Sequence, residues 1–456
     1  MHPGRVAPEF RASHSGSVGG MADSLELDPT VTTTQDLIRL DTTNYGEGRS
    51  KGETEAAQYL EARLTALGLD VTTIEAAPGR PSIFTRVPGR NAAKPALVVH
   101  GHTDVVPAEA GNWSVDPFAG VIKDGLLWGR GAVDMKNMDA MILTAVEEIL
   151  GAGELPEREL VLAFFADEEN GGQFGSEPIA RDHPELFAGA TQAISEVGGY
   201  SITVGGKRAY LLQTGEKALL WLRLHAKGRA AHGSRVIPAE ENAVTRLAQA
   251  IAKLGSHEWP VLLNDTTTSM ITELARLLDV DPQETTPGAI VLATGSASGF
   301  LTASLRSTTN PTMLSAGYKH NVIPESASVA IDARPFPGAE DELLAEIQAI
   351  VGDDIEIETV FRGIGTQAPV SGPIVDAATA ALQRHDPEAV VVPYFLSGGT
   401  DNKALATLGI EGYGFAPLRL PEGIDFPAMF HGVDERVPLE SLVFGRKVLG
   451  DFLRSY

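Results

Sequence analysis

The chain is 456 residues long, beyond the size at which a single hydrophobic core usually stops growing, so we expect two domains. It carries 36 lysines and arginines against 60 aspartates and glutamates, a net charge of −24, and this negative field argues against nucleic acid or an anionic membrane as a partner. The sequence has no cysteine, which excludes disulfides, a thiolate nucleophile and cysteine-bound zinc, so any metal must be held by histidines and carboxylates.

The N-terminal stretch, residues 1–20, contains no apolar run, which argues against a secretory signal. We expect this stretch to be a disordered leader, with Met21 as an alternative start of translation. No run of about 18 apolar residues occurs in the chain, and the sequence therefore predicts a cytoplasmic protein without a membrane-spanning segment.

Helices and strands alternate after the leader. Ala56, Leu60 and Leu64 stand at helical spacing and predict a helix over 54–67, which Gly68 ends. A second helix is expected at 138–150, and strands are expected at 70–74, 82–87, 96–100, 159–166 and 193–197. Apolar strands alternating with helices are typical of a sheet covered on both faces, so the expected fold class is α/β with a mixed, mainly parallel sheet.

The pattern changes after about Gly215. Alternating strands at 218–225 and 328–333, with a helix at 239–254, predict a smaller α/β domain over 216–334. A polar, threonine-rich stretch at about 256–313, with a helix near 269–278, interrupts this domain and is interpreted as an insertion of unknown role. The larger domain would then be built from 21–215 and 335–456, and it would end in a helix at 439–453.

The richest motif is His100-Gly101-His102-Thr103-Asp104, at the end of the strand predicted over 96–100. Ligands in open α/β sheets collect beyond the carboxyl ends of the strands. His102 and Asp104 stand two residues apart, which allows the carboxylate to orient a metal-bound imidazole. A histidine in such a loop can also be purely structural, and the motif alone leaves that alternative open.

Acidic residues supply further candidates. Asp134 follows a glycine-rich run at 128–131, and it either binds a metal or caps the next helix. Three consecutive acids at 167–169 end an apolar strand, which is costly without a positive partner, so a divalent cation is one interpretation and a solvated loop the other. Glu196 closes another apolar strand and His431 precedes the final helix, and neither is specific alone.

Together these motifs resemble the dinuclear zinc hydrolases that include mammalian aminoacylase, bacterial glutamate carboxypeptidase, succinyl-diaminopimelate desuccinylase and yeast carboxypeptidase S. Five separated motifs occur in the family's order, and the resemblance extends from about Leu37 to the end of the chain. The run from His100 through Trp113 and 117–118 to Asp134 is especially similar to the carboxypeptidase S branch. The resemblance implies a zinc-peptidase catalytic domain with a smaller lid and dimerisation domain.

The resemblance also implies a role for each metal-site candidate. Asp134 would bridge two Zn²⁺ ions, for which Co²⁺ or Mn²⁺ could substitute. His102 and Glu196 would complete one site, and Glu169 and His431 would complete the other. These residue types suit the chemistry, because zinc held by imidazole and carboxylate lowers the pKa of a shared water and polarises the scissile carbonyl.

The remaining roles implied by the resemblance concern catalysis and substrate binding. Glu168 would be the general base that carries the proton of the water to the leaving amine, and Asp104 would steady His102. His232, in the smaller domain, would stabilise the oxyanion in the partner subunit of a homodimer. The residues that would anchor the free carboxylate of the substrate are Asn321, Arg334, Gly398, Gly399 and Thr400.

The expected function is therefore hydrolysis of an amide bond next to a free carboxylate in a small molecule, by an N-acyl-amino-acid amidohydrolase or a carboxypeptidase. Within the family, a glutamate at the position of Glu196 is associated with these two classes, and an aspartate there with aminopeptidases and dipeptidases. A succinyl-diaminopimelate desuccinylase and a dipeptidase are the alternatives. An inactive metal- or ligand-binding protein on the same scaffold is an alternative of another class, and the complete ligand set together with Glu168 argues against it.

Overall fold

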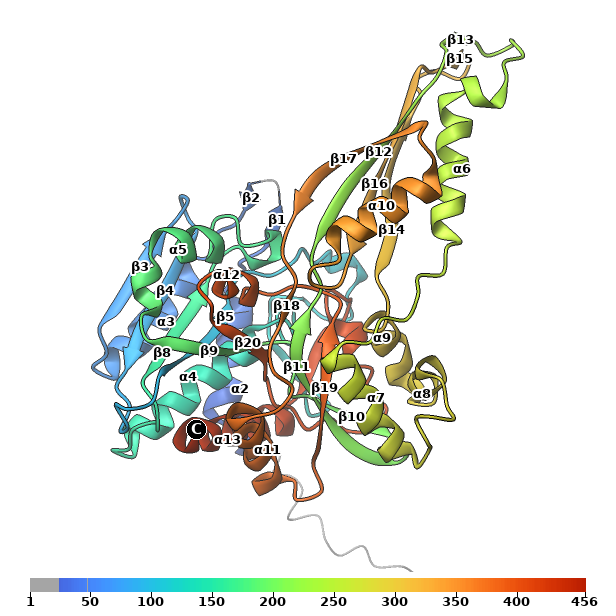
Figure 1. Ribbon diagram of the computed structural model, residues 1–456. Helices are drawn as coiled ribbons and strands as arrows, with labels where there is room; N and C mark the ends of the chain where they lie inside the picture. The colour runs from blue at the N-terminus through green and yellow to red at the C-terminus, as the bar shows by residue number, and fades with distance from the viewer. Residues whose placement is uncertain (1–23, 47) are drawn as a thin grey trace, which may run out of the picture.

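The computed structural model describes residues 24–46 and 48–456 (Figure 1). The predicted leader at 1–20 and Met21 lie outside the described residues. The described chain forms a large body from which a narrower arm projects (Figure 1). No helix among the described residues is long and apolar enough to cross a membrane.

A ten-stranded mixed sheet forms the centre of the body, with the order β10-β11-β20-β9-β5-β8-β4-β3 and with β18 and β19 paired to β11. Its strands are β3 (Val71–Glu75), β4 (Pro81–Val87), β5 (Ala96–His102), β8 (Leu160–Phe165), β9 (Ala190–Ser195), β10 (Ser201–Val204), β11 (Lys207–Glu216), β18 (Thr366–Gln367), β19 (Val390–Leu396) and β20 (Glu411–Gly414). Strands β8, β5, β9 and β20 are parallel to one another, and so are β11 and β19. The predicted α/β fold with a mixed sheet is confirmed.

The sheet has a core on each face because successive side chains of a strand point to opposite sides. In β5, Leu97 and Val99 belong to one buried cluster, and Val98 belongs to the cluster on the opposite face. The larger cluster also takes buried residues from α2 (Pro29–Arg39), α3 (Thr54–Ala66), α4 (Lys136–Gly151), α11 (Pro373–His385) and α13 (Leu439–Ser455). The smaller cluster takes residues from α5 (Ser176–Asp182) and α12 (Asn402–Ala406).

The arm is an antiparallel sheet with the order β14-β16-β12-β17 (Figure 1). Its main elements are β12 (Leu220–Lys227), α6 (Ala243–Gly255), β14 (Thr308–Ala316), β16 (Ser326–Arg334), α10 (Glu340–Val351) and β17 (Ile355–Arg362). Leu220, Leu222 and Leu224 form a separate core with the apolar faces of α6 and α10. A short ladder of β13 (Ala231–His232) and β15 (Val322–Ile323) forms the end of the arm farthest from the central sheet (Figure 1).

Three helices lie between α6 and β14 in the sequence, namely α7 (Asp265–Leu278), α8 (Pro287–Leu292) and α9 (Ser298–Ala303). They pack on the large body, because Leu274 and Leu301 belong to the same buried cluster as Leu211 of β11. The predicted division into 21–215, 216–334 and 335–456 stays a prediction. Since α10 and β17 contribute Leu343 and Ile355 to the core of the arm, the packing supports a boundary after β17.

Two small sheets bring loops of the body together. Strand β1 (Asn44–Gly46) pairs with β2 (Arg49–Ser50), and a second sheet has the order β21-β7-β6. The strands of the second sheet are β6 (Val121–Lys123), β7 (Leu126–Trp128) and β21 (Arg436–Pro438). Because β7 pairs with β21, the loop that follows β7 lies beside the loop that precedes β21, and these loops carry Asp134 and His431.

Candidate metal site

Three neighbouring parallel strands place their carboxyl ends at one edge of the central sheet. Strand β5 lies between β8 and β9 and ends at His102. Glu168 and Glu169 follow the end of β8, and Glu196 follows the end of β9. The side chains that end these strands therefore meet at the edge where ligands of such sheets are expected.

Asp134 lies between two histidines. His102 Nε2 is 3.1 Å from Asp134 Oδ1, and His431 Nε2 is 3.3 Å from Asp134 Oδ2. Glu196 Oε1 is 3.6 Å from His102 Nε2, and Glu169 Oε2 is 3.0 Å from His431 Nε2. The ligand atoms of each trio all lie within 4.8 Å of one another. The five residues predicted as ligands thus form two trios that share Asp134, which we call the ligand cluster.

The charges and donor atoms of the ligand cluster fit divalent cations. Burial raises the pKa of Glu196 to about 8, and the nearby Asp134 carboxylate acts in the same direction. Burial also raises the pKa of Glu169, whose Oε1 has no hydrogen-bond partner among the described residues. Carboxylates this close repel one another unless a cation offsets their charge. Imidazole and carboxylate are zinc ligands, and three protein ligands for each ion leave a position free for water or substrate.

The same negative surroundings act on the two histidines. Hydrogen bonds to Asp134 and Glu169 raise the pKa of His431 to about 11. Although burial opposes protonation of His102, Glu196 and the other nearby carboxylates hold the pKa of His102 well above its usual value. A metal must displace these protons to bind the ring nitrogens, so metal affinity is expected to fall at low pH.

Asp104 connects His102 to the acidic loop. His102 Nδ1 lies 3.1 Å from the backbone oxygen of Asp104 and 3.5 Å from its Oδ1. The carboxylate of Asp104 also accepts the backbone N–H groups of Glu168 and Glu169, at 3.0 and 3.2 Å. These contacts leave Nε2 of His102 facing the ligand cluster, which is the role expected of a residue that orients a metal ligand.

A buried arginine, Arg80, contacts the acidic loop at 167–169. Arg80 Nε lies 2.7 Å from Glu53 Oε2, and Arg80 Nη2 lies 2.8 Å from Asp167 Oδ1. Asp167 has a φ of 64°, and its Oδ1 and Oδ2 accept hydrogen bonds from Asn44 Nδ2 and from the backbone of Phe174. Nothing in the sequence pattern around Arg80 or Asn44 pointed to this role.

Glu435 holds the loop that carries Asp134. Its carboxylate accepts the backbone N–H groups of Gly131, Val133 and Asp134, and it pairs with Arg130 Nη1 at 2.7 Å. Glu435 lies in the same chain segment as His431, so a single carboxylate couples the loops that supply the shared ligand and the last ligand. The sequence motif contained Glu435, but no role for it could be derived from the motif.

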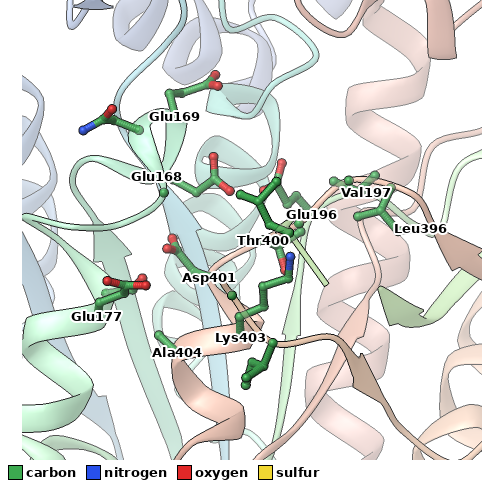
Figure 2. Close-up of a pocket in the computed structure, with 18 of the residues that line it drawn as sticks. Glu168, Glu169, Glu177, Glu196, Val197, Leu396, Thr400, Asp401, Lys403 and Ala404 are labelled. Carbon is green, nitrogen blue, oxygen red and sulfur yellow. The ribbon is translucent and has the colours of Figure 1, made fainter. Parts of the chain in front are cut away.

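Glu168 lies beside the ligand cluster and belongs to neither trio (Figure 2). Its Oε2 is 3.9 Å from His102 Nε2. Burial raises the pKa of its carboxyl well above the usual range, and the carboxylates of Glu196 and Asp401 act in the same direction. A carboxyl with a raised pKa next to candidate metal ligands has the properties of a general base.

A cavity of about 950 Å³ is lined at one part of its wall by Glu168 and by four residues of the ligand cluster, Asp134, Glu169, Glu196 and His431. Another part is apolar and includes Trp221 of β12 and Phe361 of β17, whose ring centroids are 5.4 Å apart. Phe300 of α9 also lines the cavity. The body, the arm and the helical segment between α6 and β14 therefore all contribute to the wall, which can accept a substrate with an apolar group.

Four predicted substrate anchors line the same cavity, namely Arg334, Gly398, Gly399 and Thr400. Arg334 forms a two-pronged ion pair with Asp332, at 2.6 and 2.9 Å. Thr400 donates its backbone N–H to Glu216 Oε2 at 2.7 Å. Two further residues, Asp401 and Lys403, also line the cavity and were not among the predicted site residues.

His232 and Asn321 lie elsewhere in this chain, at the far end of the arm (Figure 1). His232 is exposed, and its Nδ1 lies 2.8 Å from Ser234 Oγ. The backbone N–H of Gly233 donates to the oxygen of Asn321 at 2.8 Å, which joins the two predicted residues to each other. Within one chain the structure therefore does not bring His232 or Asn321 into the cavity wall.

Comparisons with known proteins identify relatives over most of the chain. The sequence model of peptidase family M20/M25/M40 matches residues 98–455. The chain is 28% identical to aminoacylase-1 of Sus scrofa over 433 residues, which cover 92% of this chain and 93% of the relative. It is 28% identical to the probable carboxypeptidase S-like 2 of Dictyostelium discoideum over 385 residues, covering 76% and 69%.

Solved structures share the fold. An M20 family metallo-carboxypeptidase from Sulfolobus solfataricus superposes with a TM-score of 0.72 at 20% identity, covering 94% of this chain and 99% of that chain. The YXEP protein of Bacillus subtilis, described as a dinuclear metal-binding peptidase, has a TM-score of 0.58 at 12% identity, with coverages of 95% and 98%. At these identities the likeness concerns the fold.

Proposed function

The chain belongs to peptidase family M20/M25/M40, and we propose that within this family it is a dinuclear zinc N-acyl-amino-acid amidohydrolase or carboxypeptidase. The family resemblance stated from the sequence motifs is thus confirmed, and the membership supports a hydrolase. The proposed reaction adds water to an amide bond next to a free carboxylate and releases a carboxylic acid and an amine.

The observation that carries this proposal is the shared position of Asp134. Its two oxygens face His102 and His431 at 3.1 and 3.3 Å, and each histidine has a second carboxylate beside it. An isolated metal-storage site would need neither a shared carboxylate nor a separate acid. Glu168 provides that separate acid in the same cavity.

Each residue of the site has a separate proposed role. His102, Asp134 and Glu196 would hold one zinc ion, and Asp134, Glu169 and His431 would hold the other; Co²⁺ or Mn²⁺ would suit the same donors. When bound, the two ions supply Lewis acidity towards the scissile carbonyl and lower the pKa of a water. Glu168 takes a proton from this water and passes it to the leaving amine. Asp104 keeps His102 in its binding orientation.

The small-molecule substrate is proposed to carry an apolar group and a free carboxylate. Trp221 and Phe361 form an apolar wall in the cavity that contains Glu168. Aminoacylase-1 and a carboxypeptidase S-like protein are among the relatives, which supports an acyl-amino acid or a short peptide. A dipeptidase and a succinyl-diaminopimelate desuccinylase are the alternatives that a substrate panel separates.

A homodimer completes the proposal. His232 and Asn321 lie together at the end of the arm and outside the cavity wall of their own chain. In a dimer, this end of the arm would reach the cavity of the partner subunit, where His232 would donate to the developing oxyanion. The anchors of the carboxylate would then come from both chains. A cytoplasmic location stays a prediction.

The first test is turnover of the zinc- or cobalt-loaded protein on acyl-amino acids, dipeptides and succinyl-diaminopimelate. We expect release of free amino acids from acyl-amino acids or from dipeptides whose amino group is acylated. Turnover of free dipeptides alone would indicate a dipeptidase. Glu168→Ala should lower kcat by about 10²- to 10⁴-fold and leave the zinc content unchanged. Glu177→Ala changes an acid of α5 that lines the same cavity and should leave kcat unaltered. No turnover on any substrate, or an unaltered rate in Glu168→Ala, would contradict the proposal.

Metal analysis provides a second test. Asp134→Ala removes a ligand from both trios, whereas His431→Ala removes a ligand from one. We therefore expect nearly complete loss of zinc from Asp134→Ala and retention of about one ion for each chain in His431→Ala. Equal zinc contents in the two variants would argue against a shared carboxylate.

A further inference from the structure

Lys403 lines the cavity, and its ammonium has no hydrogen-bond or ion-pair partner among the described residues. It lies on α12, directly after the turn 398–400, and its side chain extends towards Thr400 and Glu196 (Figure 2). Within the described part of the chain, no hydrogen bond is made by its ammonium, and no carboxylate oxygen lies within 4.0 Å of Nζ. Its side chain is half-buried in the cavity wall, so the ammonium has lost part of its hydration and no hydrogen bond from the described residues replaces it.

The backbone at Gly399 leaves room for this ammonium. A β-carbon at position 399 would lie 2.3 Å from Lys403 Nζ and 3.0 Å from Lys403 Cε. Any larger residue would push the side chain aside, whereas a β-carbon at Gly398 would make only ordinary contacts. Glycine at 399 thus allows the path that Lys403 takes into the cavity.

The charged groups nearest to Lys403 are already engaged. Glu216 accepts hydrogen bonds from the backbone of Thr400 at 2.7 Å and from the Thr366 hydroxyl at 3.2 Å. Arg334 donates through Nε and Nη2 to the two carboxylate oxygens of Asp332. Glu168, the remaining nearby acid, is needed as the proposed base. Lys403 is thus the cation of the cavity wall whose charge the protein leaves available.

We propose that Lys403 Nζ binds the free carboxylate of the substrate and that this contact selects substrates with a free carboxylate over neutral ones. The proposal rests on the proposed function, since it concerns the same cavity. A carboxylate that docks on the half-buried Lys403 forms a charge-assisted hydrogen bond, and such bonds are roughly twice as strong as those between neutral groups. Burial lowers the pKa of the Lys403 ammonium, and an arriving carboxylate favours the charged form again.

A kinetic comparison of an acid and its amide tests this inference. N-acetyl-L-methionine carries the carboxylate, and N-acetyl-L-methioninamide does not. We expect Lys403→Met to lower kcat/KM for the acid by roughly 10- to 100-fold and to leave kcat/KM for the amide almost unchanged. Lys403→Arg should restore part of the preference, because it restores the cation. Lys253→Met, which removes an exposed lysine of α6, is the control and should behave like the unmodified protein.

Two results would overturn the inference. One is an equal loss of activity towards the acid and the amide, which would mean that Lys403 only balances the charge of the acids or supports the turn. The other is a preference for the acid that survives in Lys403→Met, which would leave the carboxylate to the other proposed anchors, Arg334 among them. If Lys403→Met fails to fold, Lys403→Gln provides the same comparison with a polar side chain of similar length.

A binding measurement separates this inference from the proposed function. Zinc-loaded Glu168→Ala is titrated calorimetrically with N-acetyl-L-methionine, with and without the additional change Lys403→Met. We expect the additional change to raise Kd by roughly 10- to 100-fold at unchanged zinc content. Failure of turnover in the unmodified protein would refute the proposed function. An unchanged Kd, or no binding to Glu168→Ala at all, would refute the role of Lys403.

Discussion

Glu168 can accept a proton only while its carboxyl is deprotonated, so its pKa sets the acid side of the pH profile. Burial raises this pKa well above 4.5, and the charges of Glu196 and Asp401 raise it further. Below the raised pKa the proposed base is protonated and inactive. We therefore expect kcat/KM of the zinc-loaded protein to increase with pH as Glu168 loses its proton.

The variant Asp401→Asn tests this origin of the shift. Burial raises the pKa of Asp401 to about 7, so Asp401 is charged only above about this pH. There the variant removes one negative charge beside Glu168 and keeps the shape of the side chain, so the midpoint of the pH profile should move to lower pH by up to about one unit. The measurement is the dependence of kcat/KM on pH, with Glu177→Gln as a control in the same cavity. A midpoint that does not move, or moves to higher pH, would show that Asp401 does not act on the base.

Arg80 is the cation on which the buried acids behind the site depend. It contacts Glu53 and Asp167 at 2.7 and 2.8 Å, so Arg80→Met would leave both carboxylates buried without their cation. Breaking a buried ion pair from one side costs about 3–5 kcal/mol, and we expect the free energy of unfolding in urea to fall by about this amount. Arg276→Met removes an exposed pair with Glu273 and should have no measurable effect. A similar stability for both variants would contradict a buried network.

Four of the ligand candidates are prominent in the sequence because each of them ends an apolar strand or follows a glycine-rich run, whereas His431 and the ligand roles themselves came from the family resemblance. His102, Glu169 and Glu196 stand in such positions, and parallel strands bring their ends to one edge. Arg80 and Lys403 could not be predicted. Both are single cations in ordinary surroundings of the sequence, and only the tertiary structure shows that one is buried under the acidic loop and the other enters the cavity.

At the scale of elements, the segment at about 256–313 shows where hydrophobic patterning loses information. The pattern indicates a helix near 269–278, and the structure has α7 over Asp265–Leu278. An apolar helix face indicates that the helix packs on a hydrophobic core, but it does not indicate which core. The segment lies between two elements of the arm in the sequence, and yet α7 to α9 pack on the large body and bring Phe300 to the cavity wall.

A mutation in α7 tests this packing. Leu274 is fully buried in the cluster of the large body, so Leu274→Ala should lower the free energy of unfolding by about 2–5 kcal/mol. Leu292, at the end of α8, is 73% exposed, and Leu292→Ala should change it by less than about 0.5 kcal/mol. Urea denaturation of both variants provides the comparison. Equal effects would mean that α7 to α9 do not form part of the core.

At the scale of the whole molecule, the arm separates residues that the proposed chemistry needs together. His232 lies at the far end of the arm, and the ligand cluster lies at the edge of the central sheet (Figure 1). The residues alone placed His232 in the smaller domain, and its expected role in the partner subunit came from the family resemblance. His232 can therefore reach a cavity in two ways, either its own after a movement of the arm or that of a partner subunit.

Mixing two inactive variants distinguishes these possibilities. His232→Ala keeps Glu168, and Glu168→Ala keeps His232. In a twofold dimer with exchanged arms, a mixed dimer contains one complete site, built from Glu168 of one chain and His232 of the other. After the variants are unfolded and refolded together in equal amounts, half of the dimers are mixed, so about one quarter of the wild-type activity should return. If His232 serves its own chain, each site stays incomplete and no activity returns, whatever the oligomeric state found by sedimentation.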